Sequence, residues 1–498
     1  MLSGVLYALL FPKFNLAFLA PVFALPLLIY LINGARLGMR ARKAFFYGFV
    51  SGTLSWLIIL YWIYGVLLNN YAGYIASAAG WILLASYMGL YWGLFALAAF
   101  LAVRLDLRFK ALLVAAAWVL FEYARTYIFT GFPWLLAGYS LAGNPLLIQT
   151  SSLWGVYGLS FIILYLNTGL SFAVTSRKFR PLIIPLILTA ASVFYGYAAL
   201  KGEKERPPGD MNVAVLQGNI SQYEKWDAAY EEKILAAYSE LYLEVLGKSS
   251  PDIVIWPETT LPAALNTSEK MKSYVRSLAR KSGAYNLVGS VENARGKYYN
   301  SAFMVKPSGE IESPYRKMRL VPFGEFIPFR AMLSPFVGVV NEIGDFSSGD
   351  SYRILSAGEA KVAAGICYED IFPRLAAGSI SEGANLYVNI TNDGWFLDSA
   401  GGPQHYVHLI LRAAENRVWA VRAANTGVSA VISPYGELTG ETEFLTADTL
   451  SGKVNLRGKR TVYTLYGDIL IYLLAAAVIV ILWKERKCLK NIKKKLKN

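Results

Sequence analysis

Cysteine and histidine, the residues that build cross-links and transition-metal sites, are almost absent from this chain. Its 498 residues include only two cysteines, Cys367 and Cys488, and two histidines, His405 and His408. The cysteines lie far apart in the sequence and are expected on opposite sides of a membrane, so we expect no structural disulfide. A zinc site needs several Cys and His ligands at close spacing, so we expect no metal and no cofactor. The fold must therefore be held together by burial.

Charged residues are also scarce. They make up 16% of the chain, against 55% hydrophobic residues, and the mean hydropathy is +0.38. This composition is too apolar for an ordinary water-soluble enzyme of this size, so membrane segments are expected. Long apolar runs fill residues 1–200, whereas residues 201–466 read like a water-soluble domain. We expect a transmembrane helix bundle of about seven spans, a large inserted domain, and a final transmembrane helix with a basic tail over residues 467–498.

Eight apolar segments are candidate membrane spans. They cover residues 2–12, 15–33, 45–66, 76–103, 111–125, 153–176, 181–200 and 468–483. A helix needs about 20 apolar residues to cross a bilayer, so the first and fifth segments are short for a span. The first segment lacks a charged leader and a small-residue cleavage site, so we expect it to be a retained anchor.

Lys and Arg are missing from alternate connections between these segments. Loops 68–73 and 128–145 contain none. The connections that alternate with these two loops contain several, and so does the C-terminal tail. By the positive-inside rule, the basic connections face the cytoplasm and residues 201–466 face outward. The tail after Trp483, with eight Lys or Arg residues and one Glu, supplies half of the net charge of +14. Such a tail indicates contact with anionic lipid, so we expect no nucleic-acid partner.

Glu122 and Arg125 form a charged pair near the outer end of the fifth segment. One interpretation is a site for a lipid head group. The other is a local ion pair, or side chains that snorkel to the interface. The sequence leaves both open.

Strand-like and helix-like segments alternate through residues 201–466. Strands are expected over 211–220, 251–262, 285–292, 362–371 and 384–396, and 298–311 reads as a hairpin with a Ser-Gly turn. Helical spacing of apolar residues predicts helices over 230–246, 269–282 and 405–425, and a strand follows over 427–438. This alternation is typical of a layered α/β domain.

Three polar residues stand where strands end or turn. Glu258 follows a strand, Lys317 lies in a turn, and Cys367 follows the strand-like run before it. Residues at strand ends can meet at one edge of a sheet. A thiol needs a base to become a nucleophile, and a cation can hold the oxyanion that forms when the thiolate attacks a carbonyl. Glu258, Lys317 and Cys367 have the chemistry for these three roles.

Each of these residues also has a structural interpretation. A cysteine after a strand is often only a small buried apolar residue. Glu258 could cap a helix, and Lys317 could belong to a solvated basic face with its arginine neighbours. The spacing of the three residues does not by itself define a site.

Four motifs carry a resemblance to a known family. They are WPET (256–259), YRKMRLVPFGEFIP (315–328), GICYED (365–370) and NITNDGWF (389–396), in this order between apolar segments. Together with the segment 131–161, they resemble bacterial apolipoprotein N-acyltransferases, which are membrane-anchored members of the nitrilase superfamily. The resemblance implies a multi-span α-helical membrane bundle plus an extracytoplasmic α/β nitrilase-like domain, an αββα sandwich.

The resemblance also implies roles for individual residues. It makes Glu258 the general base, Lys317 the oxyanion-stabilising cation and Cys367 the nucleophile. Residues that the family needs for full activity, or places near the active site, correspond here to Glu325, Tyr368, Glu369, Trp226 and Trp395.

The implied reaction moves an acyl chain between two lipids. Cys367 takes the chain from a phospholipid donor as a thioester, and Lys317 with the backbone N–H of Tyr368 stabilises the oxyanion. The N-terminal amine of the diacylglyceryl-cysteine of an apolipoprotein then accepts the chain. The resemblance places the protein in the bacterial inner membrane with its catalytic domain on the periplasmic side. We expect a monomer, because the bundle and the membrane block the helix through which soluble nitrilases often oligomerise.

Two other functions remain open at this point. A membrane-anchored amidase or nitrilase would use the same three residues, with water as the acceptor. A transporter or scaffold would use the outer domain only to bind, and replacing Cys367 by alanine would leave its function intact.

Overall fold

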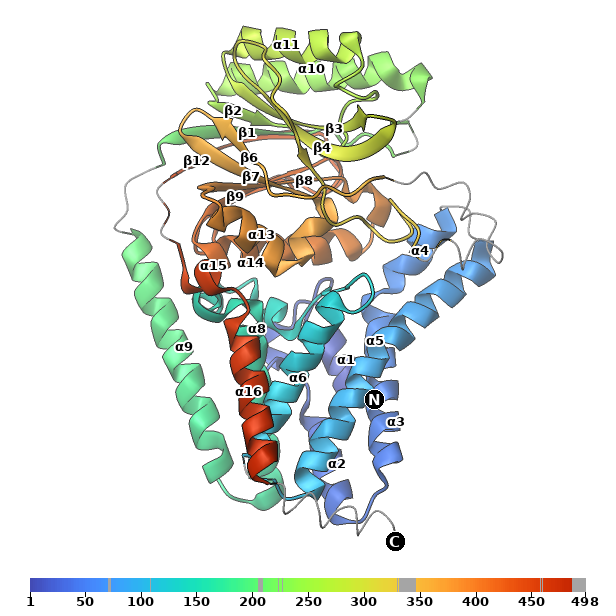
Figure 1. Cartoon of the computed structure of the whole chain (residues 1–498), viewed down its shortest axis with the longest axis vertical. Helices are drawn as coiled ribbons and strands as arrows, with labels where there is room; N and C mark the ends of the chain where they lie inside the picture. The colour runs from blue at the N-terminus through green and yellow to red at the C-terminus, as the bar shows by residue number, and fades with distance from the viewer. Residues whose placement is uncertain are drawn as a thin grey trace. The chain divides into compact units, whose positions relative to one another are not determined.

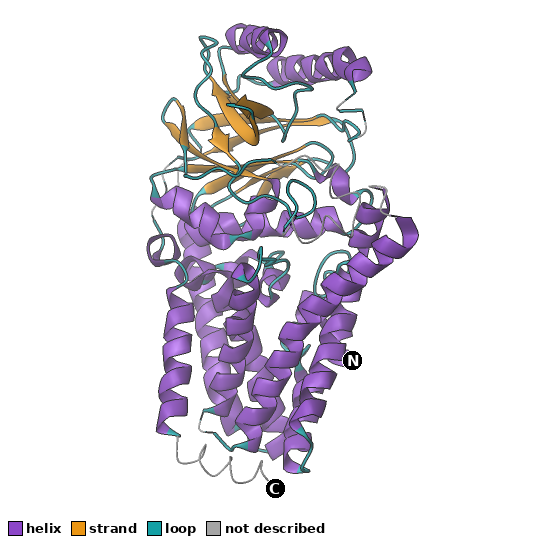
Figure 2. Ribbon diagram, turned by 45° about the vertical axis from the view of Figure 1, so that its right-hand side comes forward, coloured by secondary structure: helices purple, strands orange, loops and turns teal. Residues whose placement is uncertain are grey.

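The computed structural model describes residues 1–485 except 70–72, 108, 205–208, 223, 226, 329, 331–345, 457 and 459. The chain divides into two compact units. The first consists of Met1–Leu200 and the chain from Tyr466 on, and the second of Lys201–Leu465. Described strands occur only in the second unit, as the orange arrows of Figure 2 show.

The first unit is built of helices. They are α1 (Leu2–Ala8), α2 (Leu25–Arg36), α3 (Ala41–Ile59), α4 (Tyr61–Asn69), α5 (Gly73–Arg104), α6 (Lys110–Tyr127), α7 (Pro145–Ile148), α8 (Ser151–Ser176), α9 (Arg180–Lys204) and α16 (Ile469–Lys484), with 3₁₀ turns η1 (Ala17–Leu19) and η2 (Ala137–Leu141). Among the described residues, three helices, α5, α8 and α9, are long and apolar enough to cross a membrane. A fourth span results if α3 and α4 count as one. The expected number of about seven spans remains a prediction.

Two of the expected spans differ from the helices observed. The segment 15–33 does not form one helix, because α2 begins only at Leu25 and has Pro26 in its first turn. Proline is well placed there, since it lacks the N–H that a first turn leaves unpaired. The segment 45–66 is broken into α3 and α4, which bend by 53°. Contiguous apolar sequence therefore does not by itself predict a straight helix.

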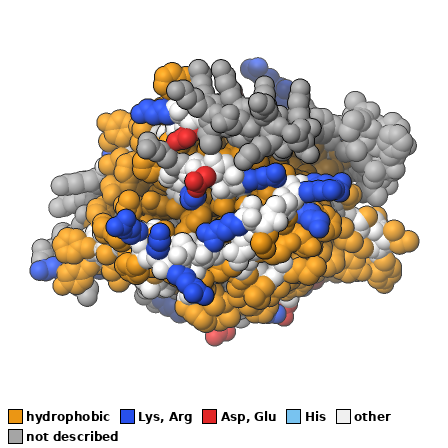
Figure 3. All heavy atoms as spheres, turned by 90° about the horizontal axis from the view of Figure 1, so that it is seen from below, with side chains coloured by type: hydrophobic (Ala, Val, Ile, Leu, Met, Phe, Trp, Pro, Cys, Tyr) orange, Lys and Arg blue, Asp and Glu red, His pale blue; other side chains and the backbone are white. Residues whose placement is uncertain are grey.

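Basic residues gather at one end of the first unit. They lie at the helix ends that α2, α3, α5, α6, α8, α9 and α16 share at the bottom of Figure 1, and Figure 3 shows their side chains on that face. The Arg36 guanidinium donates to the Thr175 carbonyl at 2.9 Å, which ties the end of α2 to that of α8. This clustering is the pattern that the positive-inside rule describes.

Glu122 and Arg125 on α6 are both buried inside the first unit. Glu122 Oε1 accepts a hydrogen bond from the Ala137 N–H at 2.7 Å. The Arg125 guanidinium lies 4.8 Å from the centre of the Trp56 ring. The two side chains therefore do not snorkel. The Glu122 side chain instead anchors the turn η2 by accepting from the backbone N–H of Ala137.

The second unit contains two six-stranded sheets (Figure 1). The first has the order β12-β1-β2-β3-β4-β5, from β12 (Asp448–Val454), β1 (Met211–Gln217), β2 (Ile253–Ile255), β3 (Tyr285–Ala294), β4 (Lys297–Val305) and β5 (Tyr315–Arg316). The second has the order β11-β10-β9-β8-β7-β6, from β11 (Leu438–Glu441), β10 (Ala430–Ile432), β9 (Trp419–Ala424), β8 (Leu386–Thr391), β7 (Ala360–Ile366) and β6 (Ile354–Ala357). Three parallel strands form the middle of each sheet, β1 to β3 and β7 to β9.

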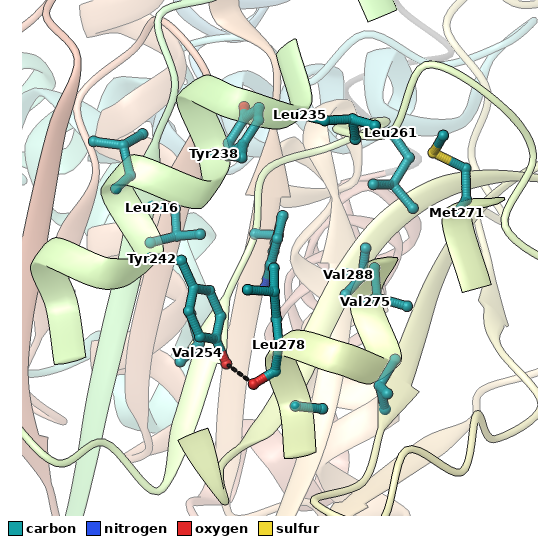
Figure 4. Packing of buried hydrophobic residues seen from close by; sticks show 14 of the residues in the cluster. Leu216, Leu235, Tyr238, Tyr242, Val254, Leu261, Met271, Val275, Leu278 and Val288 are labelled. Atoms are coloured by element: carbon teal, nitrogen blue, oxygen red, sulfur yellow. Dashed lines mark hydrogen bonds between the residues drawn. The ribbon is translucent and has the colours of Figure 1, made fainter. Parts of the chain in front are cut away.

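Helices cover the outer faces of the two sheets. α10 (Glu231–Lys248) and α11 (Glu269–Ser282) lie on the first sheet, and α13 (Pro373–Ser381) and α14 (Gly401–Asn416) on the second. Figure 4 shows Tyr238 and Tyr242 of α10 packed with Val254 and Val288 of the strands. The predicted layered α/β domain is confirmed, with helix, sheet, sheet and helix as its layers. Short turns η3 (Ala228–Tyr230), η5 (Cys367–Ile371) and η6 (Asp393–Phe396) and the helix α15 (Val462–Tyr466) complete the described elements.

Two predicted elements of this unit are wrong in part. The helix expected over 405–425 ends at Asn416, because Arg417 adopts a left-handed conformation with φ of 53°. The residues that follow form the buried strand β9, since a short apolar run suits a central strand as well as a helix. The strand expected over 427–438 is a hairpin, in which β10 and β11 flank a turn at Gly436. The helices expected over 230–246 and 269–282 and the Ser-Gly turn near Gly309 are confirmed.

Candidate active site

The three candidate catalytic residues follow strands of the two facing sheets. Glu258 follows β2, Lys317 comes directly after β5, and Cys367 directly after β7. All three side chains are buried. Lys317 Nζ lies 3.3 Å from Glu258 Oε1. The first sheet therefore supplies the carboxylate and the ammonium group, and the second supplies the thiol.

Glu258 is held by three hydrogen-bond donors. Oε1 accepts from Asn300 Nδ2 at 2.7 Å and from Lys317, and Oε2 accepts from the Asn392 N–H at 2.9 Å. Gly289 on β3 makes room for this segment, since a Cβ there would lie 2.2 Å from the Pro257 carbonyl oxygen. The carboxylate is thus fixed in position by both sheets.

Lys317 is paired with a second carboxylate, Glu325. Its Nζ lies 2.9 Å from Glu325 Oε1, which also accepts from Asn300 Nδ2 at 2.9 Å. Burial by itself would lower the pKa of Lys317, but the carboxylates of Glu325 and Glu258 raise it above its ordinary value. Lys317 is therefore a permanent cation over the physiological range of pH.

Cys367 is the first residue of the tight turn η5, which directly follows β7. Its φ is +52°, a left-handed conformation that is uncommon for a residue other than glycine. Burial, followed by the carboxylate of Glu258, raises the pKa of the Cys367 thiol above its ordinary value, and Lys317 opposes this shift. The resting side chain is therefore a neutral thiol. It needs a base before it can act as a nucleophile.

Glu369 ties the Lys317 segment to the turn that holds Cys367. Oε1 accepts from the Met318 N–H at 2.7 Å, and Oε2 accepts from the Ile366 N–H at 2.8 Å. The hydroxyl of Tyr315 donates to the same carboxylate. Burial raises the pKa of Glu369 to about 7, although the backbone N–H groups of Ile366 and Met318 and the charge of Lys317 oppose the shift. Glu369 thus fixes the position of the cation relative to the thiol.

The remaining predicted site residues occupy different environments. Tyr368 is buried and packs edge-to-face on Phe372, with ring centres 5.3 Å apart. Trp395 is 42% exposed in the turn η6, which follows the Asn392 backbone that binds Glu258. Trp226 lies outside the described residues.

Two further residues of this site were not predicted. Asn300 donates to both Glu258 and Glu325, and it stands out only as an amide within an apolar strand. Lys225 Nζ donates to the Glu258 carbonyl oxygen at 2.8 Å and to Thr259 Oγ1 at 2.7 Å. Burial lowers the pKa of Lys225 to about 8, although the charge of Glu258 opposes the shift. When all four groups are charged, Lys225 and Lys317 together balance the carboxylates of Glu258 and Glu325.

No metal-binding arrangement is found among the described residues, since none of their His, Cys, Asp and Glu side chains form a group of three or more suited to an ion. The chemistry that this site can perform follows from its own groups. A buried thiol, a fixed carboxylate and a permanent cation can form and break an acyl-sulfur bond.

Comparison with known proteins places this arrangement in a family. Residues 212–462 match the model of the carbon-nitrogen hydrolases, and residues 3–169 match that of the apolipoprotein N-acyltransferase N-terminal domain. The second unit is thus a nitrilase-like domain attached to a bundle of apolar helices, which confirms the expected fold class. The extracytoplasmic orientation of the domain remains a prediction.

Relatives along the whole chain narrow the class further. An apolipoprotein N-acyltransferase of Geobacter metallireducens is 37% identical over 98% of this chain and 95% of its own length. One of Brucella melitensis is 33% identical over 88% of this chain and 86% of its own. The chain belongs to the apolipoprotein N-acyltransferase family, which confirms the resemblance seen in its motifs. Among solved structures, a mutant of the Nesterenkonia AN1 amidase from the nitrilase superfamily covers 50% of this chain and 92% of its own, with 17% identity and a TM-score of 0.41.

Proposed function

We propose that this protein is an apolipoprotein N-acyltransferase that works through a thioester on Cys367. The observation that carries the proposal is the network in which Lys317 contacts the carboxylates of Glu258 and Glu325, while Glu258 and Lys317 act electrostatically on the buried Cys367. Family membership supports the choice of substrates, a phospholipid as acyl donor and an apolipoprotein as acceptor.

The first half-reaction begins with proton transfer. Glu258 takes the proton of the Cys367 thiol, and the thiolate attacks the ester carbonyl carbon of the phospholipid. An ammonium group has three N–H donors, and two of those of Lys317 point to Glu258 and Glu325. The third meets the oxyanion of the tetrahedral intermediate. The ester C–O bond breaks, and protonated Glu258 returns its proton to the leaving oxygen of the lysophospholipid.

The second half-reaction uses the same groups in reverse. The neutral N-terminal amine of the diacylglyceryl-cysteine attacks the thioester carbonyl carbon, and Lys317 again holds the oxyanion. Glu258 accepts the proton that the amine loses, and the C–S bond breaks. The products are an amide and the Cys367 thiolate, which recovers its proton from Glu258. Both steps balance without a cofactor.

The location of the reaction follows from the substrates and the charge distribution. We propose a multi-pass protein of the bacterial inner membrane, acting as a monomer. The basic end of the helical unit faces the cytoplasm and residues 201–466 face the periplasm, because both lipid substrates lie in the outer leaflet. The tail from residue 486 on lies outside the described residues.

Mass spectrometry of the intact protein tests the proposal. Incubation with phospholipid alone adds one acyl chain to Cys367, and hydroxylamine at neutral pH removes it, as expected for a thioester. Adding a diacylated lipopeptide discharges the chain and produces the N-acylated peptide. A thioester that water discharges at the same rate without the peptide would identify a hydrolase. A protein that gains no acyl mass and works equally well as the Cys367→Ala variant would be a binding protein instead.

A further inference from the structure

The backbone carbonyl of Cys367 lies within hydrogen-bond distance of side chains from two neighbouring elements. His405 Nε2, on α14, lies 3.2 Å from the Cys367 carbonyl oxygen, and Asn389 Nδ2, on β8, lies 3.4 Å from it. Cys367 has φ of +52°, a backbone conformation that costs free energy and persists only where its surroundings enforce it. The hydrogen bond from His405 is therefore in the right place to enforce it.

His405 is itself fixed by two buried charges. Its Nδ1 lies 3.0 Å from Asp393 Oδ1 on η6 and 3.0 Å from an amino group of Arg422 on β9. Arg422 also pairs with Asp393 at 3.0 Å. All three side chains are at most 2% exposed. Burial would raise the pKa of Asp393, but Arg422 and His405 hold it at about 2, so this carboxylate stays ionised.

The partners of His405 determine the role of each ring nitrogen. A carbonyl oxygen can only accept, so Nε2 must carry the proton that it shares with Cys367. Nδ1 faces both an acceptor, Asp393, and a donor, Arg422. A neutral ring accepts from Arg422 through Nδ1, and a protonated ring donates to Asp393. In both states Nε2 donates to the Cys367 carbonyl.

We propose that His405 is a positioning residue, held by Asp393 and Arg422, that locks the Cys367 turn in its left-handed conformation through Nε2. This inference rests on the proposed acyl transfer at Cys367 and adds a group that acts through the nucleophile's backbone. The thiol and the N–H groups after it are directed by that turn. Loss of the hydrogen bond lets the turn relax, so the thiol spends less time where it can attack, and we expect no change in phospholipid binding.

Two amide substitutions distinguish the role of His405 Nε2 from that of Nδ1. The amide nitrogen of glutamine matches the position of Nε2, and that of asparagine matches Nδ1. His405→Gln therefore keeps a donor for Cys367, whereas His405→Asn keeps only a group for Asp393 and Arg422. The control is His408→Asn, one turn along α14, because His408 is equally buried and uses Nδ1 to bind the His405 carbonyl at 3.1 Å.

The assay measures thioester formation on Cys367 in a single turnover at several phospholipid concentrations, with the full-length protein in detergent. We expect His405→Asn to lower the maximal rate about tenfold, the effect of one lost hydrogen bond, without changing the concentration for half-maximal rate. His405→Gln and His408→Asn should stay within about twofold of the wild type. Thermal unfolding of each variant is measured in parallel.

Each alternative outcome has a definite meaning. If His405→Asn reacts at the wild-type rate, or if both His405 variants slow equally in proportion to lost thermal stability, the positioning role is refuted. If His405→Asn does not fold, His405→Gln decides, because a folded Gln variant without acylation also refutes it. A wild-type protein that forms no thioester would instead refute the proposed function and leave the role of His405 to be judged by thiol alkylation rates in the same variants.

Discussion

Removing or fixing the charge of Lys225 should change the response of the reaction to alkaline pH. Lys225 is 2% exposed, and burial lowers its pKa to about 8. It contacts the backbone of Glu258 and interacts electrostatically with Cys367. In the proposed thioester mechanism negative charge develops on the sulfur and then on the oxyanion, so a positive Lys225 should favour the reaction. As pH rises through about 8, the wild-type protein loses this charge.

The size of the effect follows from the titration curve. At pH 8 about half of the Lys225 side chains are charged, and at pH 9 about a tenth, since each pH unit changes the ratio tenfold. Arginine stays charged throughout this range. Relative to the wild type, the rate of Lys225→Arg should therefore rise about twofold from pH 6 to pH 8 and about tenfold by pH 9. Lys225→Met should react more slowly than the wild type at every pH. The difference between the two rates should become smaller above pH 8.

The free energy of unfolding should rise with pH, whereas the contribution of Lys225 to the rate falls. The unfolded chain keeps the proton of Lys225 up to its ordinary pKa of 10.5, whereas the folded protein loses it near 8. The unfolded state therefore binds more protons between these values, and stability rises with pH in this window. The gain corresponds to about 3 kcal/mol across the window, and the Lys225→Met protein should lack it.

The assay is single-turnover thioester formation, followed by mass on Cys367 between pH 6 and 9.5 for the three proteins. Taking the ratio of each variant to the wild type cancels the titration of all other groups. A ratio of Lys225→Arg to wild type that stays constant over this range would refute the reasoning. If arginine is too large for the buried position and Lys225→Arg does not fold, Lys225→Met decides. The decisive observation is then whether the rate difference between Lys225→Met and the wild type becomes smaller above pH 8.

The other predictions concern the nucleophile, its partners and sidedness. Cys367→Ala should abolish acylation and Cys488→Ala should not, and transfer by the first variant would refute the nucleophile assignment. Lys317→Met should slow thioester formation by about a hundredfold or more at every pH, because one oxyanion donor is worth about 3 kcal/mol. Glu258→Gln should slow thioester formation, and its rate should partly recover as pH rises, because the thiol then ionises without the base and one of the charges that raise its pKa is gone. Recovery in the Lys317 variant alone would show that the roles are reversed. An impermeant maleimide should label engineered cysteines near Lys201 in intact cells but not Cys488, and the opposite pattern would overturn the topology.

Local sequence predicted the strands and their ends well. β1, β3, β7 and β8 were anticipated because continuous apolar runs next to turn residues are typical of buried parallel strands. The same property made β9 ambiguous. Its run lacks Gly and Pro, and the helix before it stops at Arg417, a residue with no preference for the left-handed conformation. The tertiary position between β8 and β10, and not the local pattern, makes this segment a strand.

The candidate site was predictable only in part, because its supporting contacts are long-range. The position of Glu258, Lys317 and Cys367 after strands could be inferred, and the motifs indicated Glu325 and Glu369. Contacts that join distant segments could not be inferred from the sequence. Lys225 meets a carbonyl 33 positions away, and His405 meets one 38 positions away. Nothing in the sequence around either residue reveals its partner.

The division of the site between the two sheets makes reactivity depend on how the sheets slide over each other. Glu258 and Lys317 belong to one sheet, and Cys367, with the Asn392 backbone, to the other. A shift of about 1 Å between the layers would change the distance for proton transfer, and displacements of that size can cost about a hundredfold in rate. We therefore expect side chains packed between the sheets to set this distance and with it the rate of the proposed reaction. Enlarging or shrinking one of them should alter the acylation rate before it unfolds the protein.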